Sequence, residues 1–323
     1  MSLKFIHICC FLLLFGTKVF PAEAWPAMIN FPEAEVLSEN TVRIPFHMAD
    51  HLILVQGSIN GKQGHLIIDT GSKHLVINKK HFKKQPAQLA SGVGYSVNGS
   101  MDQIMAQRIQ NFSFSTFKIP NRIADRIDLS HIEKNKKERI LGIIGHDVLY
   151  DFEIYVDFYL NQITLFRTDR KGNRIDEHLF LDTPVSETPF EIRGHSIILN
   201  TTVNNATLDM ALDTGAEINF LDTKAPEEVL ERFRGIKKIK IRGMGQKRSE
   251  MIAGKLYGLQ LNNEQPIGVM RTILADLSDM TEAYGTRVDG VLGYDFIAMK
   301  RLLINYKKKA ITFVKLPLSA KRP

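Results

Sequence analysis

The chain has 323 residues and carries a formal net charge of +7 at pH 7. This length holds two domains of average size, or one large one, with enough chain for a buried core. The only cysteines are Cys9 and Cys10, so the chain beyond them can form no disulfide and no thiolate metal site. Lysine clusters such as residues 134–137 lack interleaved aromatic residues, which argues against a nucleic-acid module and indicates solvated surface.

The first residues predict a secretory signal peptide over residues 1–24. Lys4 supplies a positive start, Phe5 to Gly16 is apolar, and Ala22-Glu23-Ala24 has the form of a cleavage site. The alternative is an uncleaved membrane anchor, but the apolar stretch is shorter than the ~20 residues of a spanning helix. After cleavage we expect no stable membrane span. An exported chain without disulfides fits a bacterial periplasm or surface, so a periplasmic or secreted protein is expected.

From residue 41 onward the pattern predicts mostly short strands. A β-branched strand ends at the turn Asn60-Gly61, and an apolar strand then runs into Asp69-Thr70-Gly71. A further strand is expected at His74 to Ile77, followed by a glycine-rich hairpin over residues 91–99. A short helix is expected just after Gly145.

Residues 169–185 are polar around a central Lys-Gly-Asn and are predicted to link two lobes, residues 41–168 and residues 186–316. The second lobe is expected to repeat the order of the first. Its elements are a turn at Asn204-Asn205, a strand entering Asp213-Thr214-Gly215, a strand at Glu217 to Leu221, a helix within Pro226 to Phe233, a hairpin over residues 242–247 and a helix after Gly293.

An internal duplication explains this repetition. A shift of 144 residues places the first Asp-Thr-Gly on the second without a gap, and a shift of 148 residues aligns a second block. The matched segments are Pro45-Phe46 with Pro189-Phe190, Asp69-Thr70-Gly71 with Asp213-Thr214-Gly215, and Gly142 to Asp147 with Gly290 to Asp295. The chain therefore contains two copies of one unit rather than a solenoid array.

The motif set resembles the aspartic protease superfamily, and its retropepsin-like branch in particular. Each copy has an apolar strand running into Asp-Thr-Gly-Ser or Asp-Thr-Gly-Ala, and an apolar-apolar-Gly-x-Asp segment. These segments are Asp69 to Ser72 and Ile143 to Asp147 in the first copy, and Asp213 to Ala216 and Val291 to Asp295 in the second. Together the copies cover nearly all of the chain beyond the predicted signal peptide.

The resemblance implies an all-β fold of two related retropepsin-like closed β-barrel lobes, with a pseudo-twofold axis and few short helices. Retropepsins complete their site by dimerising, whereas this chain resembles the joined form, a monomer with an intramolecular pseudo-dimer. In the family the second segment threads beside the catalytic loop and opens a short helix. Pairing between two separate chains is the alternative arrangement.

Two neighbouring carboxyl groups can hydrolyse a peptide bond. One carboxylate deprotonates water while a carboxylic acid polarises the scissile carbonyl. Like charges ~3 Å apart cannot both ionise easily, so such a pair shares one proton and its pKa values belong to the pair. We therefore expect Asp69 and Asp213 to act jointly as general base and general acid.

Six residues are expected to support the two aspartates. They are Thr70, Gly71 and Ser72 in the first copy and Thr214, Gly215 and Ala216 in the second. The glycines permit close approach of the opposite loop, and the resemblance implies that the threonines hydrogen-bond across the pseudo-twofold axis. The Ser72 hydroxyl can donate to a neighbouring carboxylate and Ala216 cannot, so our hypothesis is that Asp69 is the more acidic partner.

The two glycine-rich hairpins are candidates for flaps that close over an extended substrate. Their flap candidates are Gly92, Gly94, Tyr95, Gly243 and Gly245. Ordinary β-turns are the alternative, because glycine commonly marks turns.

The sequence thus favours an exported aspartic endopeptidase with a polypeptide substrate. No cofactor and no metal are expected, since no His-Glu-x-x-His zinc helix occurs, and His51 and His195 are interpreted as packing or surface residues. No nucleic-acid partner is expected. The alternative is a catalytically silent peptide-binding protein of the same fold.

Overall fold

The computed structural model describes residues 34–83, 88–89, 95–96, 99–100, 105–114, 117–177, 183–242, 248–261, 265–278, 280 and 284–315. The predicted signal peptide lies outside these residues. The protein is mostly β, with 56% strand and 11% helix. It contains one closed six-stranded barrel and two larger open sheets. No helix in the described segments is long and apolar enough to cross a membrane.

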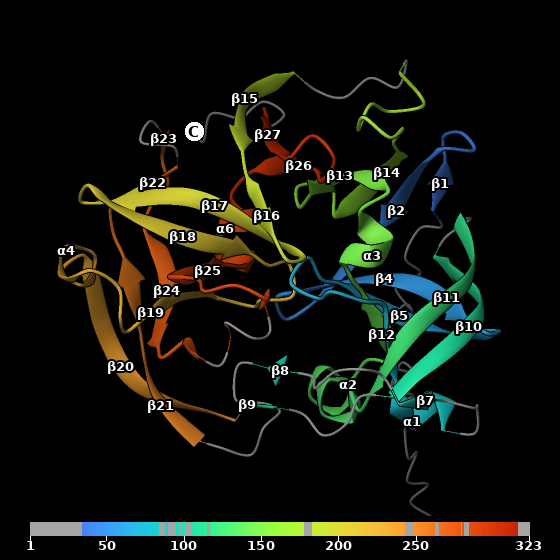
Figure 1. The fold of residues 1–323 in the computed structure, drawn as a ribbon, viewed down its shortest axis with the longest axis horizontal. Helices are drawn as coiled ribbons and strands as arrows, with labels where there is room; N and C mark the ends of the chain where they lie inside the picture. The colour runs from blue at the N-terminus through green and yellow to red at the C-terminus, as the bar shows by residue number, and fades with distance from the viewer. Residues whose placement is uncertain are drawn as a thin grey trace, which may run out of the picture. The chain divides into compact units, whose positions relative to one another are not determined.

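The first copy forms the closed barrel (Figure 1). Six strands make the ring, in the order β4 (Leu52–Ile59), β5 (Lys62–Ile68), β12 (Ile140–Ile144), β6 (Val76–Asn78), β11 (Phe117–Ile127) and β10 (Met105–Phe114). Strand β10 pairs with both β11 and β4, and this second pairing closes the ring. Strands β3 (His47–Ala49) and β7 (Gln88–Leu89) extend the sheet beyond the ring. A separate pair, β8 (Tyr95–Ser96) and β9 (Gly99–Ser100), completes this copy.

The second copy forms an open sheet. Its strands are, in order, β20 (Phe233–Arg242), β21 (Arg248–Leu256), β24 (Met270–Ala275), β19 (Asn219–Asp222), β25 (Gly290–Leu292), β18 (Ala206–Leu212), β17 (Ser196–Val203), β22 (Leu259–Leu261) and β23 (Gln265–Pro266), with β16 (Glu191–Arg193) also paired to β17. The long hairpin of β20 and β21 curves along the outer edge of this sheet (Figure 1).

Two closed barrels were predicted, and the structure has one. In the first copy the unbroken strand β10 pairs with β11 and with β4. In the second copy two separate strands make the equivalent pairings. Strand β21 pairs with β24, and strand β22 pairs with β17. Tyr257 and Gly258 separate β21 from β22. Gly258 has a φ of +77°, which a strand residue does not adopt.

A third sheet joins the copies. It contains β1 (Glu35–Val36), β2 (Thr41–Pro45), β14 (Gln162–Arg167), β13 (Phe152–Asp157), β26 (Arg301–Asn305), β27 (Ala310–Val314) and β15 (Pro184–Pro189), in that order. The copies meet where β13 pairs with β26. Beside this seam the guanidinium of Arg301 donates to the carboxylate of Asp157 at 2.8 Å, and both side chains are buried. Because each buried charge would be costly alone, the pair holds the seam in register.

Each copy threads one strand between the two strands that flank its Asp-Thr-Gly loop. Strand β12 lies parallel to β5 and antiparallel to β6, and β25 lies in the same way between β18 and β19. The threaded strands pass so close to their neighbours that a Cβ on Gly142 would lie 2.0 Å from the carbonyl oxygen of Val76. A Cβ on Gly290 would lie 2.5 Å from the carbonyl oxygen of Phe220. Only glycine fits at either position.

Three short helices lie where the sequence predicted them. Helices α3 (His146–Leu149) and α6 (Tyr294–Ile297) follow directly after Gly145 and Gly293, and α4 (Glu227–Leu230) lies inside its predicted range. Helices α1 (Lys79–Phe82) and α2 (Ser130–Lys136) were not predicted. No apolar residue of α2 is buried, so it lacks the apolar periodicity by which a helix is predicted.

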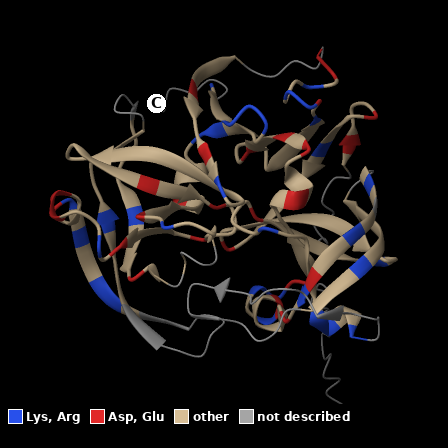
Figure 2. Ribbon diagram, in the orientation of Figure 1, with Lys and Arg blue, Asp and Glu red and all other residues tan. Residues whose placement is uncertain are grey.

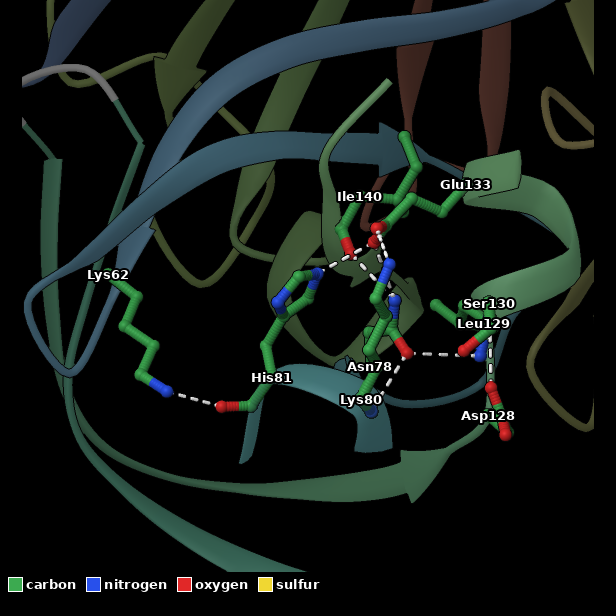
Figure 3. Close-up of polar contacts among 9 residues, drawn as sticks. All are labelled: Lys62, Asn78, Lys80, His81, Asp128, Leu129, Ser130, Glu133 and Ile140. Carbon is green, nitrogen blue, oxygen red and sulfur yellow. Dashed lines mark hydrogen bonds and ion pairs between the residues drawn. The ribbon is translucent and has the colours of Figure 1, made fainter. Parts of the chain in front are cut away.

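A polar cluster fixes α1 and α2 against the barrel (Figure 3). The side chain of Asn78, which is fully buried, accepts from the backbone N–H groups of Lys80 and Leu129, both at 3.2 Å. Its amide nitrogen donates to the carbonyl oxygen of Ile140 at 2.9 Å. Glu133 of α2 contacts the His81 ring at 2.6 Å. One buried amide therefore ties both helices to β12.

Lys and Arg residues recur along β20, at the outer edge of the second copy's sheet (Figure 2). Arg234, Lys237 and Lys238 of this strand are exposed. Charged residues on an edge strand oppose pairing with the edge of another sheet. These charges are therefore interpreted as protection of the edge.

We predict that Gly142→Ala destabilises the fold severely. The added methyl group would collide with the Val76 carbonyl, and moving that backbone would disturb β6, at a cost of roughly 3 kcal/mol or more. The matched control is Gly268→Ala, since nothing lies within 4 Å of a Cβ at that position. Its unfolding free energy should change by less than about 1 kcal/mol. Equal effects of the two variants in urea denaturation would contradict this prediction.

Candidate active site

The two Asp-Thr-Gly loops meet through reciprocal hydrogen bonds. The N–H of Thr70 donates to the Thr214 hydroxyl at 3.0 Å, and the N–H of Thr214 donates to the Thr70 hydroxyl at 3.1 Å. Each hydroxyl also donates across the pair, from Thr70 to the Leu212 carbonyl at 2.9 Å and from Thr214 to the Ile68 carbonyl at 2.8 Å. Both threonines are buried. The expected cross-bonding of the two loops is confirmed.

The glycines of the two loops lie against the opposite carboxyl groups. A Cβ on Gly71 would lie 2.5 Å from the carboxyl carbon of Asp213, and a Cβ on Gly215 would lie 2.5 Å from that of Asp69. Any side chain larger than hydrogen would displace the partner's carboxyl group. The crossing therefore brings Asp69 and Asp213 together, as their positions in the two copies predicted.

Backbone donors orient both carboxyl groups. Asp69 Oδ1 accepts from the N–H groups of Gly71 at 2.8 Å and Ser72 at 3.0 Å. Asp213 Oδ1 accepts from the N–H of Gly215 at 2.7 Å. Burial raises the pKa of Asp69 well above 3.8, and the charge of Asp213 and a hydrogen bond with its carboxyl group raise it further. The pair can thus hold a proton at pH values where an ordinary aspartate is ionised.

The hydrogen bond that Ser72 was expected to donate to a neighbouring carboxyl group is not formed, so the stated ground for a more acidic Asp69 is wrong. The Ser72 hydroxyl donates to the carbonyl oxygen of His74 at 3.1 Å, and only its backbone N–H reaches the Asp69 carboxyl group. Burial outweighs the two N–H donors, so the pKa of Asp69 moves upward. Ala216 has no hydroxyl, yet Asp213 does accept a hydrogen bond from another hydroxyl in its own copy.

That hydroxyl belongs to Tyr284, which sequence reasoning missed. Its Oη donates to Asp213 Oδ2 at 2.6 Å, and the side chain is only 3% exposed. Burial raises the pKa of this phenol, and the Asp213 charge adds to the effect, so Tyr284 stays protonated and keeps its donor. The Ser196 hydroxyl donates to the Tyr284 carbonyl at 3.0 Å and helps to fix the residue. Tyr284 lies in the part of the second copy that neither sequence shift aligns, so the repeat gave no sign of it.

His51 and His195, which the shift of 144 residues places on one another, take different places in the structure. His195 is buried, and its Nε2 lies 3.0 Å from the carbonyl oxygen of Gly71 in the opposite copy's loop. Burial lowers the pKa of His195. His51 instead stacks on Tyr294, with ring centroids 4.3 Å apart. The expectation of packing residues holds for both, but His195 packs directly against a candidate active-site loop.

Four of the five flap candidates, Gly92, Gly94, Gly243 and Gly245, lie outside the described residues. Tyr95 lies in β8, which pairs with β9. Strands β20 and β21 pair up to Arg242 and Arg248, so they flank the second predicted hairpin. A role as flaps stays a prediction.

Comparison with protein-family models and with curated proteins finds no match for this chain. A function is therefore inferred from the geometry of the two loops.

We predict that Asp69→Asn changes how stability depends on pH. Since the pKa of Asp69 is raised in the folded state, the folded protein binds a proton more tightly than the unfolded chain, and stability from this group is lost as pH rises above about 4. The slope is up to about 1.4 kcal/mol per pH unit for one proton. Urea unfolding at several pH values should show the wild-type decline and a flatter curve for Asp69→Asn.

The matched control is the exposed Asp128→Asn, whose carboxylate accepts local hydrogen bonds from Ser130 and lies apart from the dyad. Its curve should keep the wild-type decline between about pH 5 and pH 7. A wild-type decline that persists in Asp69→Asn would contradict the assignment of the proton to this pair.

Proposed function

We propose that this protein is an exported aspartic endopeptidase that hydrolyses peptide bonds with water activated between Asp69 and Asp213. The observation that carries the proposal is the crossed pair of Asp-Thr-Gly loops, which holds two carboxyl groups together in a buried setting. The raised pKa of Asp69 supports it, because one of the two groups must be an acid while the other is a base.

The retropepsin-like, two-lobed fold is part of the same proposal. It is supported by one closed barrel, by a threaded strand in each copy, and by a central sheet to which both copies contribute strands. In this arrangement one chain supplies both halves of the site, so a monomer would be active. The second copy would be a lobe in which the barrel is opened at Tyr257 and Gly258.

The proposed reaction begins with the proton on Asp69 and a water molecule between the two carboxyl groups. Asp213 takes a proton from the water while the water oxygen bonds to the scissile carbonyl carbon. Asp69 gives its own proton to the carbonyl oxygen. The tetrahedral intermediate then breaks its C–N bond. The amine leaves with the proton held by Asp213, and the intermediate's hydroxyl proton returns to Asp69.

Tyr284 is proposed as the residue that positions Asp213 as the base. A hydroxyl that donates to a carboxylate favours the charged form of that group. In the first copy the Ser72 hydroxyl does not serve Asp69 in this way, because it donates to the His74 carbonyl. The two chemically equal aspartates are thus given different surroundings, which is how a pair is divided into acid and base.

We predict that Asp69→Asn and Asp213→Asn each lose cleavage of a denatured protein substrate by at least about 100-fold, since each removes one member of the acid–base pair. Asp128→Asn should cleave at the wild-type rate. Cleavage retained by either dyad variant would rule out the proposal. If the wild-type chain binds peptides but cleaves none, the catalytically silent peptide-binding protein is the better description.

We predict that Tyr284→Phe lowers kcat by about tenfold with a smaller change in KM, because a charge-assisted hydrogen bond contributes roughly 1.5–3 kcal/mol. The acidic limb of the pH profile for kcat/KM should move upward by about one pH unit, as Asp213 loses a donor to its charged form. Tyr257→Phe serves as the control, since Tyr257 packs under Arg234 instead. A lower rate with an unmoved pH profile would show that Tyr284 only supports the fold.

A further inference from the structure

A second cluster of ionisable side chains lies in the first copy and shares no residue with the dyad. It consists of His47 in β3, His65 in β5, and Glu138, which directly precedes Arg139 and β12. His47 Nε2 lies 3.2 Å from Glu138 Oε1, and His65 Nδ1 lies 3.0 Å from Glu138 Oε2. The two imidazole rings are 4.5 Å apart at an angle of 73°. One carboxylate thus faces two imidazoles.

Strand pairing brings these residues together. His47 lies opposite Leu54 and His65 lies opposite Gln56 on the strand between them, β4. Residues two apart on a strand point to the same face, so both imidazoles project from one face of the sheet. His65 also pairs with Ile140, and its N–H donates to the Arg139 carbonyl at 2.8 Å, which places Glu138 beside it. Strand pairing therefore places the two histidines side by side and brings Glu138, just before β12, next to them.

The spacing of the donor atoms suits a metal ion. Ligand atoms bonded at the distances found for zinc in a tetrahedral site lie ~3.3 Å apart. The two histidine-to-glutamate distances are close to this value, and all of the donor atoms lie within 4.8 Å of one another. Two imidazole nitrogens and one carboxylate oxygen form a donor set that zinc sites use together with a bound water.

The exposure of the three side chains suits a site that an ion can enter. The side chains of His47, His65 and Glu138 are 12%, 19% and 30% exposed, so the cluster is sheltered but open enough to admit an ion and a water.

We propose that His47 Nε2, His65 Nδ1 and the Glu138 carboxylate bind a divalent transition-metal ion of the zinc type, with the remaining position open to water. The ion would replace the hydrogen bond between His47 and Glu138 and the close contact between His65 and Glu138. It would connect the start of β12 to β3 and β5, and so hold in place the strand that threads beside Asp69. Binding would stabilise the folded chain by mass action. The proposal does not depend on peptidase activity.

The test uses the full chain after treatment with a chelator and dialysis, with Zn²⁺ added by isothermal titration. We expect one equivalent to bind with a Kd of ~1 µM or tighter. His47→Ala and His65→Ala should each weaken that affinity by at least about 100-fold, since each leaves two ligands. His81→Ala is the matched control, because His81 also contacts a glutamate, Glu133 (Figure 3), and among the described residues this pair belongs to no group of three possible ligands.

Glu138→Gln keeps the shape of the side chain and removes its charge, so it tests the site even if an alanine variant fails to fold. It should weaken Zn²⁺ binding while circular dichroism stays unchanged. Thermal unfolding adds a second measurement, in which Zn²⁺ raises the Tm of the wild type and of His81→Ala but not that of Glu138→Gln. The proposal is overturned if the wild type binds no Zn²⁺ below about 100 µM, or if Glu138→Gln and His65→Ala bind it as tightly as the wild type. Either result would leave a hydrogen-bonded His-Glu-His cluster only.

Discussion

The hydrogen bonds exchanged by Thr70 and Thr214 are the contact on which the candidate active site depends. Each threonine satisfies a buried N–H and a buried carbonyl of the opposite copy, so neither loop can move without leaving polar groups unpaired. This exchange sets Gly71 and Gly215 against the opposite carboxyl groups. The closeness of the carboxyl groups follows from that crossing, and it adds to the effect of burial in raising the pKa of Asp69.

The two copies share a plan but differ where chemistry would need them to differ. The crossing and the threaded strands are nearly symmetric, and symmetric surroundings would give two equal carboxyl groups. Tyr284 breaks this equality, since its phenol donates to Asp213 and not to Asp69. The sheets differ as well, because the interruption at Gly258 opens the second copy while an unbroken β10 closes the first. In the proposed enzyme, this asymmetry divides one pair of aspartates into acid and base.

The sequence predicted correctly the features that short motifs or their repetition mark. The two loops, the glycines that allow them to cross, and the helices after Gly145 and Gly293 all belong to segments that match between the copies. It failed for Ser72, because the direction of a hydroxyl is set by which acceptor is nearest in space, here the His74 carbonyl. It also missed α2, which is held by polar contacts from Asn78 and Glu133 rather than by an apolar stripe.

The sequence by itself determined that the chain is a duplicated, strand-rich unit carrying one aspartate per copy, because local pattern and internal repetition are written in the order of residues. Only the tertiary structure decided which groups surround those aspartates. Tyr284 reaches Asp213 across 71 positions, and His47, His65 and Glu138 meet only because β4 aligns β3 with β5. Such contacts depend on strand register and on the folding of distant segments onto one another, and no local pattern records them.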